Sequence, residues 1–121
     1  MTAAGAGPGA PPGWPREVPP PQAAGWEAKA VGWLLDHCPA EYRGYPVVRR
    51  HPRLLAWLAG HQVDAQLEAA RQAYAQFRRD LEAPLGPEVV AEVLATLEEE
   101  GARLIALRRS VRLVAEALDR T

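Results

Sequence analysis

Proline placement is the feature that most constrains the fold of this 121-residue chain. No proline lies between Pro52 and Pro84 or after Pro87, and the helix formers Ala, Leu, Gln, Glu and Arg dominate both intervals. Pro52 and Pro87 suit the first turn of a helix, where the missing N–H is not needed, and Pro84 is expected to close the helix before it. The sequence therefore predicts helices over 52–83 and 87–119, and the short turn between them makes the pair antiparallel.

Apolar residues recur with heptad spacing on both of these helices. The second helix repeats an apolar residue every seven positions, at Val90, Leu97, Leu104, Val111 and Leu118. The first helix carries a matching seam of Ala56, Gly60, Val63, Leu67, Ala70, Tyr74, Phe77 and Leu81. Heptad spacing on both partners is the pattern of a coiled-coil-like pair. The sequence therefore predicts an all-α fold built on a long antiparallel two-helix hairpin.

The turn also determines which residues meet across the seam. Folding the chain about Leu85 places Ala70 opposite Gly101. Small residues facing each other allow the helix axes to approach toward the low end of the ~8–10 Å range. One seam position is anomalous, because Arg108 falls inside the seam. Two alternatives are open for it: a buried pair with Asp64, which could reach it, or an extended side chain whose charged end lies in water.

The N-terminal part of the chain differs in composition. Residues 1–24 hold seven of the twelve prolines and several glycines, so we expect a disordered tail ahead of a helical domain at 25–121. Apolar spacings of three and four predict one short helix over 26–38, which Pro39 ends. Residues 39–51 are then expected to form an ordered loop, because glycine and proline interrupt helical propagation there.

The predicted hairpin has more apolar surface than its seam uses. Surplus apolar residues at 54–58 and at Val114 lie near the open end, where the helix at 26–38 is placed to cover them. That helix is too short to reach the turn end. An uncovered apolar face at the turn end is therefore a candidate surface for a partner or for a second copy of the chain.

The charge distribution predicts a basic pole, although the net charge is only -1. Segment 39–60 holds four Arg against one Glu and segment 101–121 five Arg against two acidic residues, whereas segment 87–100 holds five Glu and no base. The antiparallel fold brings both basic segments to the same end. The candidate interaction residues of this pole are Tyr42, Arg43, Tyr45, Arg49, Arg50, Arg53, Arg109 and Arg112.

Two interpretations of the basic pole stay open. Arg and aromatic side chains on an ordered loop are typical of protein interfaces, and they also suit phosphate binding. Alternatively, the Arg residues offset the helix dipole at the end of a helix, which explains Arg120 well but Arg108 and Arg112 poorly, since these two are like charges one turn apart. Nucleic acid or another polyanion is the secondary candidate, because domains that bind nucleic acid are usually far more basic overall.

No catalytic or cofactor motif stands out in the sequence. His37, Cys38, His51 and His61 have none of the usual metal-ligand spacings, and no base that would activate Cys38 can be identified. No glycine-rich phosphate loop follows a predicted strand. We therefore expect no metal, no cofactor and no enzymatic activity.

These observations together favour a non-catalytic protein–protein interaction module, an adaptor or regulatory subunit that docks through its helical hairpin on another protein or on itself. Nucleic-acid or other polyanion binding through the Arg-rich pole is the alternative. The longest uncharged apolar run, 54–60, is far shorter than the ~20 residues that span a bilayer, and the N-terminus lacks the pattern of a secretory signal. We therefore expect a cytoplasmic protein with no membrane partner, and the excess of Arg over Lys indicates a bacterial source.

Overall fold

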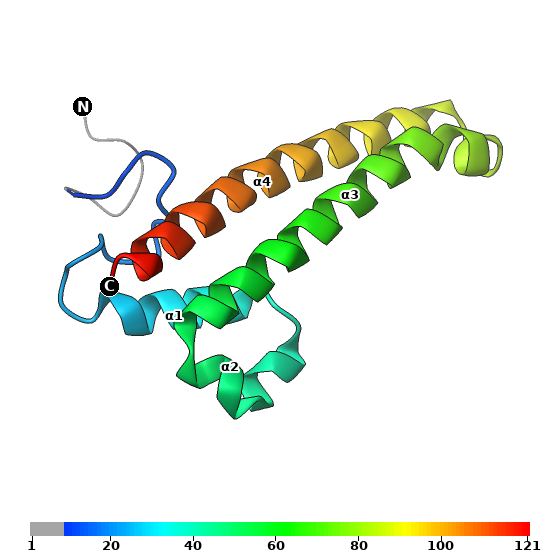
Figure 1. Ribbon diagram of the computed structural model, residues 1–121. Coiled ribbons are helices and arrows are strands. Elements are labelled where there is room, and N and C mark those ends of the chain that lie inside the picture. The colour runs from blue at the N-terminus through cyan, green and yellow to red at the C-terminus, as the bar shows by residue number, and fades with distance from the viewer. Residues whose placement is uncertain (1–8) are drawn as a thin grey trace.

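The computed structural model describes residues 9–121, and every regular element in that range is helical (Figure 1). The predicted all-α fold with a long helical hairpin is confirmed. The elements in chain order are α1 (Trp26–Asp36), the 3₁₀ helix η1 (Ala40–Gly44), α2 (Pro46–Arg50), α3 (Pro52–Leu85) and α4 (Pro87–Asp119). Figure 1 shows α3 and α4 side by side along most of their length, with α1 and α2 gathered at the open end of the hairpin.

The turn between α3 and α4 consists of Gly86 alone. Its φ of 82° lies in a region that favours glycine, and its N–H bonds the carbonyl oxygen of Glu82 at 3.0 Å. The prediction that Pro84 closes the helix is wrong, because α3 continues through it to Leu85. Pro84 removes only one hydrogen bond of the last turn, so the backbone reversal at Gly86 ends the helix instead.

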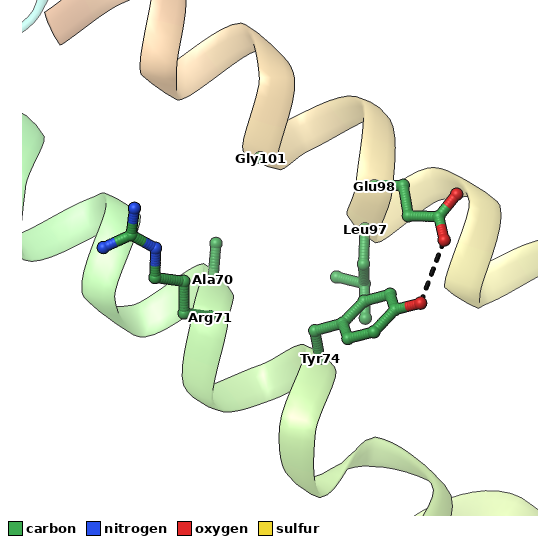
Figure 2. A pocket seen from close by; sticks show the side chains of 6 residues that line it. All are labelled: Ala70, Arg71, Tyr74, Leu97, Glu98 and Gly101. Atoms are coloured by element: carbon green, nitrogen blue, oxygen red, sulfur yellow. Dashed lines mark hydrogen bonds between the residues drawn. The ribbon is translucent and has the colours of Figure 1, made fainter.

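The contacts observed between α3 and α4 agree with the residue pairing that the sequence predicted. The Tyr74 hydroxyl donates to a carboxylate oxygen of Glu98 at 2.9 Å, and Ala70 shares one surface hollow with Gly101 (Figure 2). At the far end, the Arg53 guanidinium donates to the carbonyl oxygen of Asp119 at 2.7 Å. These contacts fix the alignment of α3 and α4 along most of their length.

Of the two alternatives for Arg108, the ion pair with Asp64 is not formed. Arg108 is half-buried, and none of the ion pairs within residues 9–121 includes it. Its side chain instead lines a surface hollow on α4 together with Arg109 and Arg112. A long side chain can place its methylene groups along the seam while its charged end reaches water, which avoids the cost of burying the guanidinium.

The main hydrophobic core lies at the open end of the hairpin. The short helix α1 packs there on α3 and α4, as the surplus apolar residues predicted, and it ends at Asp36 rather than at Cys38. Residues 39–51 are ordered as η1 and α2 rather than as an irregular loop, and Pro46 opens α2 at its first position. The core residues from these elements are Trp26, Ala30, Trp33, Leu34, Leu35, Val48, Leu55, Ala56, Ala59, Val63, Val111, Val114, Ala117 and Leu118.

The N-terminal segment belongs to this core, so the expectation of a disordered tail is wrong for residues 9–24. Trp14 is 2% exposed and Val18 is fully buried, and the Trp14 ring lies 6.0 Å from that of Trp26. Burying each such side chain contributes about 1.5–3 kcal/mol. Prolines also restrict the unfolded chain, so ordering this segment costs less entropy than its composition suggests. The rest of that prediction, residues 1–8, lies outside the described residues.

Side chains of α4 hold the backbone of this segment in place. Ser110 Oγ donates to the carbonyl oxygen of Gly13 at 2.7 Å, and the Arg109 guanidinium donates to that of Pro12 at 3.1 Å. Gly13 has a φ of 93°, and a Cβ at this position would lie 2.6 Å from Arg109 Nε. The Trp14 indole N–H donates to the carbonyl oxygen of Val18 at 2.9 Å. The segment is thus docked by specific contacts as well as by apolar burial.

Replacing Trp14 by alanine should lower the free energy of unfolding by about 3–5 kcal/mol, the usual cost of deleting a buried Trp side chain. Urea unfolding followed by circular dichroism measures the change. Trp57 is the matched control, since it is 62% exposed and Trp57→Ala should cost much less. Equal losses for the two variants would show that Trp14 does not contribute to the core.

Candidate functional site

One face of the hairpin turn is built mainly of uncharged residues. On α3, steps of three and four residues place Ala69, Ala73, Gln76 and Asp80 on one side of the helix. The same steps on α4 give Val89, Val93, Thr96 and Glu100. We call these eight residues the turn-half face.

The end of α1 marks where this face begins. Asp36 to Pro39, at and just beyond the end of α1, share one hollow with Gln62 and Gln66 of α3 and with Arg103 of α4. Gln62 and Gln66 continue the α3 stripe of the turn-half face toward the base, and Arg103 continues the α4 stripe. The short helix α1 therefore lies on the same face of the hairpin and covers only its base. Within the described part of the chain, no other element packs on the turn half (Figure 1).

An apolar groove runs between α3 and α4 along the turn-half face. The groove encloses about 420 Å³, and its lining includes Phe77, Leu81 and Leu85 of α3 and Val93 and Leu97 of α4. Leu81 is 46% exposed and Leu85 is 39% exposed. The structure thus leaves an apolar surface uncovered at the turn end.

The few charges on the turn-half face are largely neutralised. The Arg103 guanidinium donates two hydrogen bonds to the carboxylate of Glu100, at 2.9 and 2.7 Å, and these bonds hold the pKa of Glu100 below its ordinary value. Asp80 is the other charged member of the face. The other six residues of the face are uncharged, and an apolar centre beside them is a feature of the middle of protein–protein interfaces.

The opposite side of the seam is different in character. The hollow there arises because Ala70 faces Gly101, and two charged residues, Arg71 and Glu98, line it (Figure 2). The hydrogen bond to Glu98 raises the pKa of the Tyr74 hydroxyl. This hollow is therefore bordered by charge and closed on one side by an internal hydrogen bond, unlike the turn-half face.

Several predicted Arg residues of the basic pole are engaged inside the molecule. Arg43 pairs with Asp36 at 2.6 Å, and Arg49 donates to the carbonyl oxygen of Arg43 at 3.5 Å. Arg53 binds the carbonyl oxygens at the end of α4, as a base near a helix C-terminus should. Because Arg109 holds the N-terminal segment, these four residues have structural partners.

The remaining predicted residues of the pole are divided between two places. Tyr42 accepts a hydrogen bond from Gln62 at 3.2 Å and stacks on Tyr45, whose ring centroid lies 5.9 Å away. Arg50 lies on α2, whereas Arg112 lies on α4. Figure 1 shows α2 on the far side of α3 from α4. The structure therefore brings the predicted residues to one end of the molecule but does not gather them into a single patch.

Of the groups considered for metal or nucleophilic chemistry, His37 and Cys38 lie in the hollow where the turn-half face begins, beside Arg103. Within residues 9–121, no cluster of three or more His, Cys, Asp or Glu side chains could hold a metal ion. Burial lowers the pKa of His37, whose ring stacks edge-on against Trp33 at 4.9 Å, and burial raises the pKa of the Cys38 thiol. No helix in the range that the structure describes is long and apolar enough to cross a membrane.

Sequence reasoning anticipated an uncovered face at the turn end, but not the residues that form it. The signal was present as a run of uncharged residues, Ala69, Ala73 and Gln76, at steps of four and three within a helix that is otherwise rich in charge. A count of surplus apolar residues overlooked this stripe, because Ala is only weakly apolar and Gln is polar.

Comparison with known protein families, with curated proteins and with solved structures finds no match to this chain. The functional argument therefore depends on the geometry and charge of the turn-half face and of the basic pole.

Replacing Gly101 by alanine should raise the free energy of unfolding by up to about 1 kcal/mol, because glycine is the weaker helix former by that amount. The added Cβ would meet nothing within 4 Å. Thermal unfolding of the variant measures the effect. A lower melting temperature would mean that α3 and α4 approach more closely at this point than the hollow in Figure 2 indicates.

Proposed function

We propose that this protein is a non-catalytic interaction module, an adaptor or regulatory subunit, that docks through the turn half of its helical hairpin. The observation that carries the proposal is the turn-half face itself, with an uncovered apolar groove in whose lining Asp80 is the one charged residue. Charged side chains on the rest of both helices make this face distinct from ordinary solvated helix surface.

The shape of the groove favours an α-helical partner. Two antiparallel helices offer a shallow channel in which a third helix packs through residues at steps of three and four. The α3 stripe from Ala69 to Leu85 is about 24 Å long at ~1.5 Å per residue, enough for four helical turns. Exposed Leu81 and Leu85 would be the apolar anchors at the turn end.

The absence of catalysis is part of the proposal. The raised pKa of the Cys38 thiol supports it, because the thiolate is the nucleophilic form and burial disfavours that form. The described hollows open onto the surface of the helices rather than enclosing convergent polar groups, whereas catalytic pockets are concave and enclosed.

Binding of a polyanion is the second candidate function, and one observation favours it. Arg108, Arg109 and Arg112 surround a single hollow on α4, with Glu116 as the acidic residue among its lining. Such a cluster suits phosphate groups, and its affinity would fall steeply with salt. The candidate ranks second because Arg109 already holds the N-terminal segment and because the Arg residues of α2 lie elsewhere.

A single substitution on the turn-half face tests the docking proposal. Ala73→Arg places a charge at the rim of the groove, and a partner would have to bury that charge, so capture of a partner should fall about tenfold or more. The tagged full chain is used to capture proteins from native lysate treated with nuclease, and the captured proteins are quantified by mass spectrometry.

The matched control is Ala75→Arg, another exposed alanine of α3 that lies about 200° around the helix. Arginine is a good helix former, so both variants should keep the circular dichroism of the parent protein. The proposal predicts a protein whose capture is lost with Ala73→Arg and retained with Ala75→Arg. It fails if no captured protein distinguishes the two variants, and capture that depends on intact nucleic acid would favour the basic cluster instead.

A further inference from the structure

We infer that the occupant of the turn-half face is a second copy of this chain. The two copies pack antiparallel, so that the turn halves of their hairpins form a four-helix bundle. This inference rests on the proposed docking function and names the partner of the same face. It follows from the position of α1, from the order of charges along the face and from the area available.

The position of α1 decides the orientation of the second copy. α1 ends against Gln62 and Gln66, on the same stripe of α3 that continues into the turn-half face. A parallel partner would bring its own α1 against that of the first copy along the base. An antiparallel partner overlaps only the two turn halves, and the turn of each copy then reaches the end of the other copy's α1.

The length of the uncovered stretch matches this arrangement. From Gln66 to Leu85 the α3 stripe measures about 28 Å at ~1.5 Å per residue. A second copy brings a stretch of the same length, bounded by its own α1 and its own turn. Antiparallel stacking therefore fills the space beyond α1 on both copies without leaving either groove uncovered.

The charges along the face are complementary in the antiparallel order. The acidic start of α4, with Glu88 and Glu92, borders the turn end of the face, and Arg103 lies beyond its base end. Stacking α4 on α4 in opposite directions brings Arg103 of each copy toward the acidic start of α4 in the other. On the α3 stripes that meet alongside, Asp80 of each copy falls opposite the segment between Ala69 and Ala73 of the other, so the two Asp80 carboxylates do not face each other.

The area suffices for a dimer of moderate affinity. Two helices at ~8–10 Å separation present a strip about 18 Å wide, so the uncovered stretch offers on the order of 500 Å² per copy. Both copies together bury about 1,000 Å², the lower limit for a specific interface. We therefore expect a reversible dimer rather than an obligate one, with the monomer folded because its core lies at the other end of the hairpin.

Sedimentation equilibrium of the full chain from about 1 to 200 μM tests the dimer directly. The wild-type protein and Ala75→Arg should show a monomer–dimer equilibrium, whereas Ala73→Arg should remain monomeric. A wild-type protein that stays monomeric throughout overturns the inference, and so does a dimer that Ala73→Arg leaves intact.

Cysteine cross-linking tests the orientation. Cys38 is first replaced by alanine, and a new cysteine then replaces either Gln76 or Ala75. Position 76 lies on the turn-half face at the middle of the stretch from Gln66 to Leu85, next to the proposed two-fold axis, so two copies of that variant should form a disulfide under mild oxidation. The variant at position 75, on the opposite side of α3, should not. The reverse result, or cross-linking at neither position, contradicts the antiparallel stacking.

A charge exchange tests the pairing across the dimer. Arg103→Glu should weaken dimerisation about tenfold. Adding Glu92→Arg in the same chain should restore it, because a symmetric dimer contains the 103–92 pair twice and the charges of both pairs are then reversed together. Weakening without any restoration would contradict the proposed order of charges.

The two proposals fail separately. A monomeric wild-type protein that still captures another protein, lost with Ala73→Arg, overturns the second copy as occupant and retains the docking function. A monomeric protein that captures nothing sensitive to Ala73→Arg overturns both.

Discussion

The packing of α3 against α4 along a heptad seam is the constraint on which the other contacts depend. A single-residue turn at Gly86 fixes the alignment of the two helices, and one stripe of residues on each helix packs against the other. Two packed helices leave both sides of their seam exposed to water unless another segment of the chain packs on them. At the base, α1 and the N-terminal segment supply that layer, and the core follows from their apolar side chains. At the turn, the same face of the hairpin lies open.

The basic pole illustrates how structural needs can account for a charge pattern that looks functional. The N-terminal segment has few regular hydrogen bonds of its own, so its carbonyl groups need donors, and Arg109 and Ser110 provide them. Arg53 similarly meets the free carbonyl groups at the end of α4. Part of the positive charge at this end therefore stabilises chain termini, and Arg50 and Arg112 are the members best placed to meet a ligand.

The sequence sufficed for the parts of the fold that depend on local patterning. Proline placement and heptad spacing predicted the long helices, their antiparallel order and the site of the turn. The docked N-terminal segment was missed because its order depends on Trp14 meeting Trp26 and α4, contacts that no local pattern reveals. The two alternatives for Arg108 stayed open because spacing fixes the direction of Cβ but not the path of a long side chain. At the turn end, sequence reasoning located the face but not the Ala and Gln residues that form its rim.

The composition of the turn-half face suits a surface that is exposed to water in the monomer and buried in the proposed dimer. Its α3 stripe uses Ala and Gln, which favour the helix and tolerate water, while Leu81 and Leu85 at the turn supply apolar area that is buried only on association. Small alanine side chains allow a neighbouring helix to approach closely, and glutamine amides can meet polar groups at the rim. Because the folded core lies at the opposite end, association through this face need not be required for folding. In the proposed dimer, the associated fraction would therefore depend on concentration, and the orientation of the two copies on the charges at the two ends of the face.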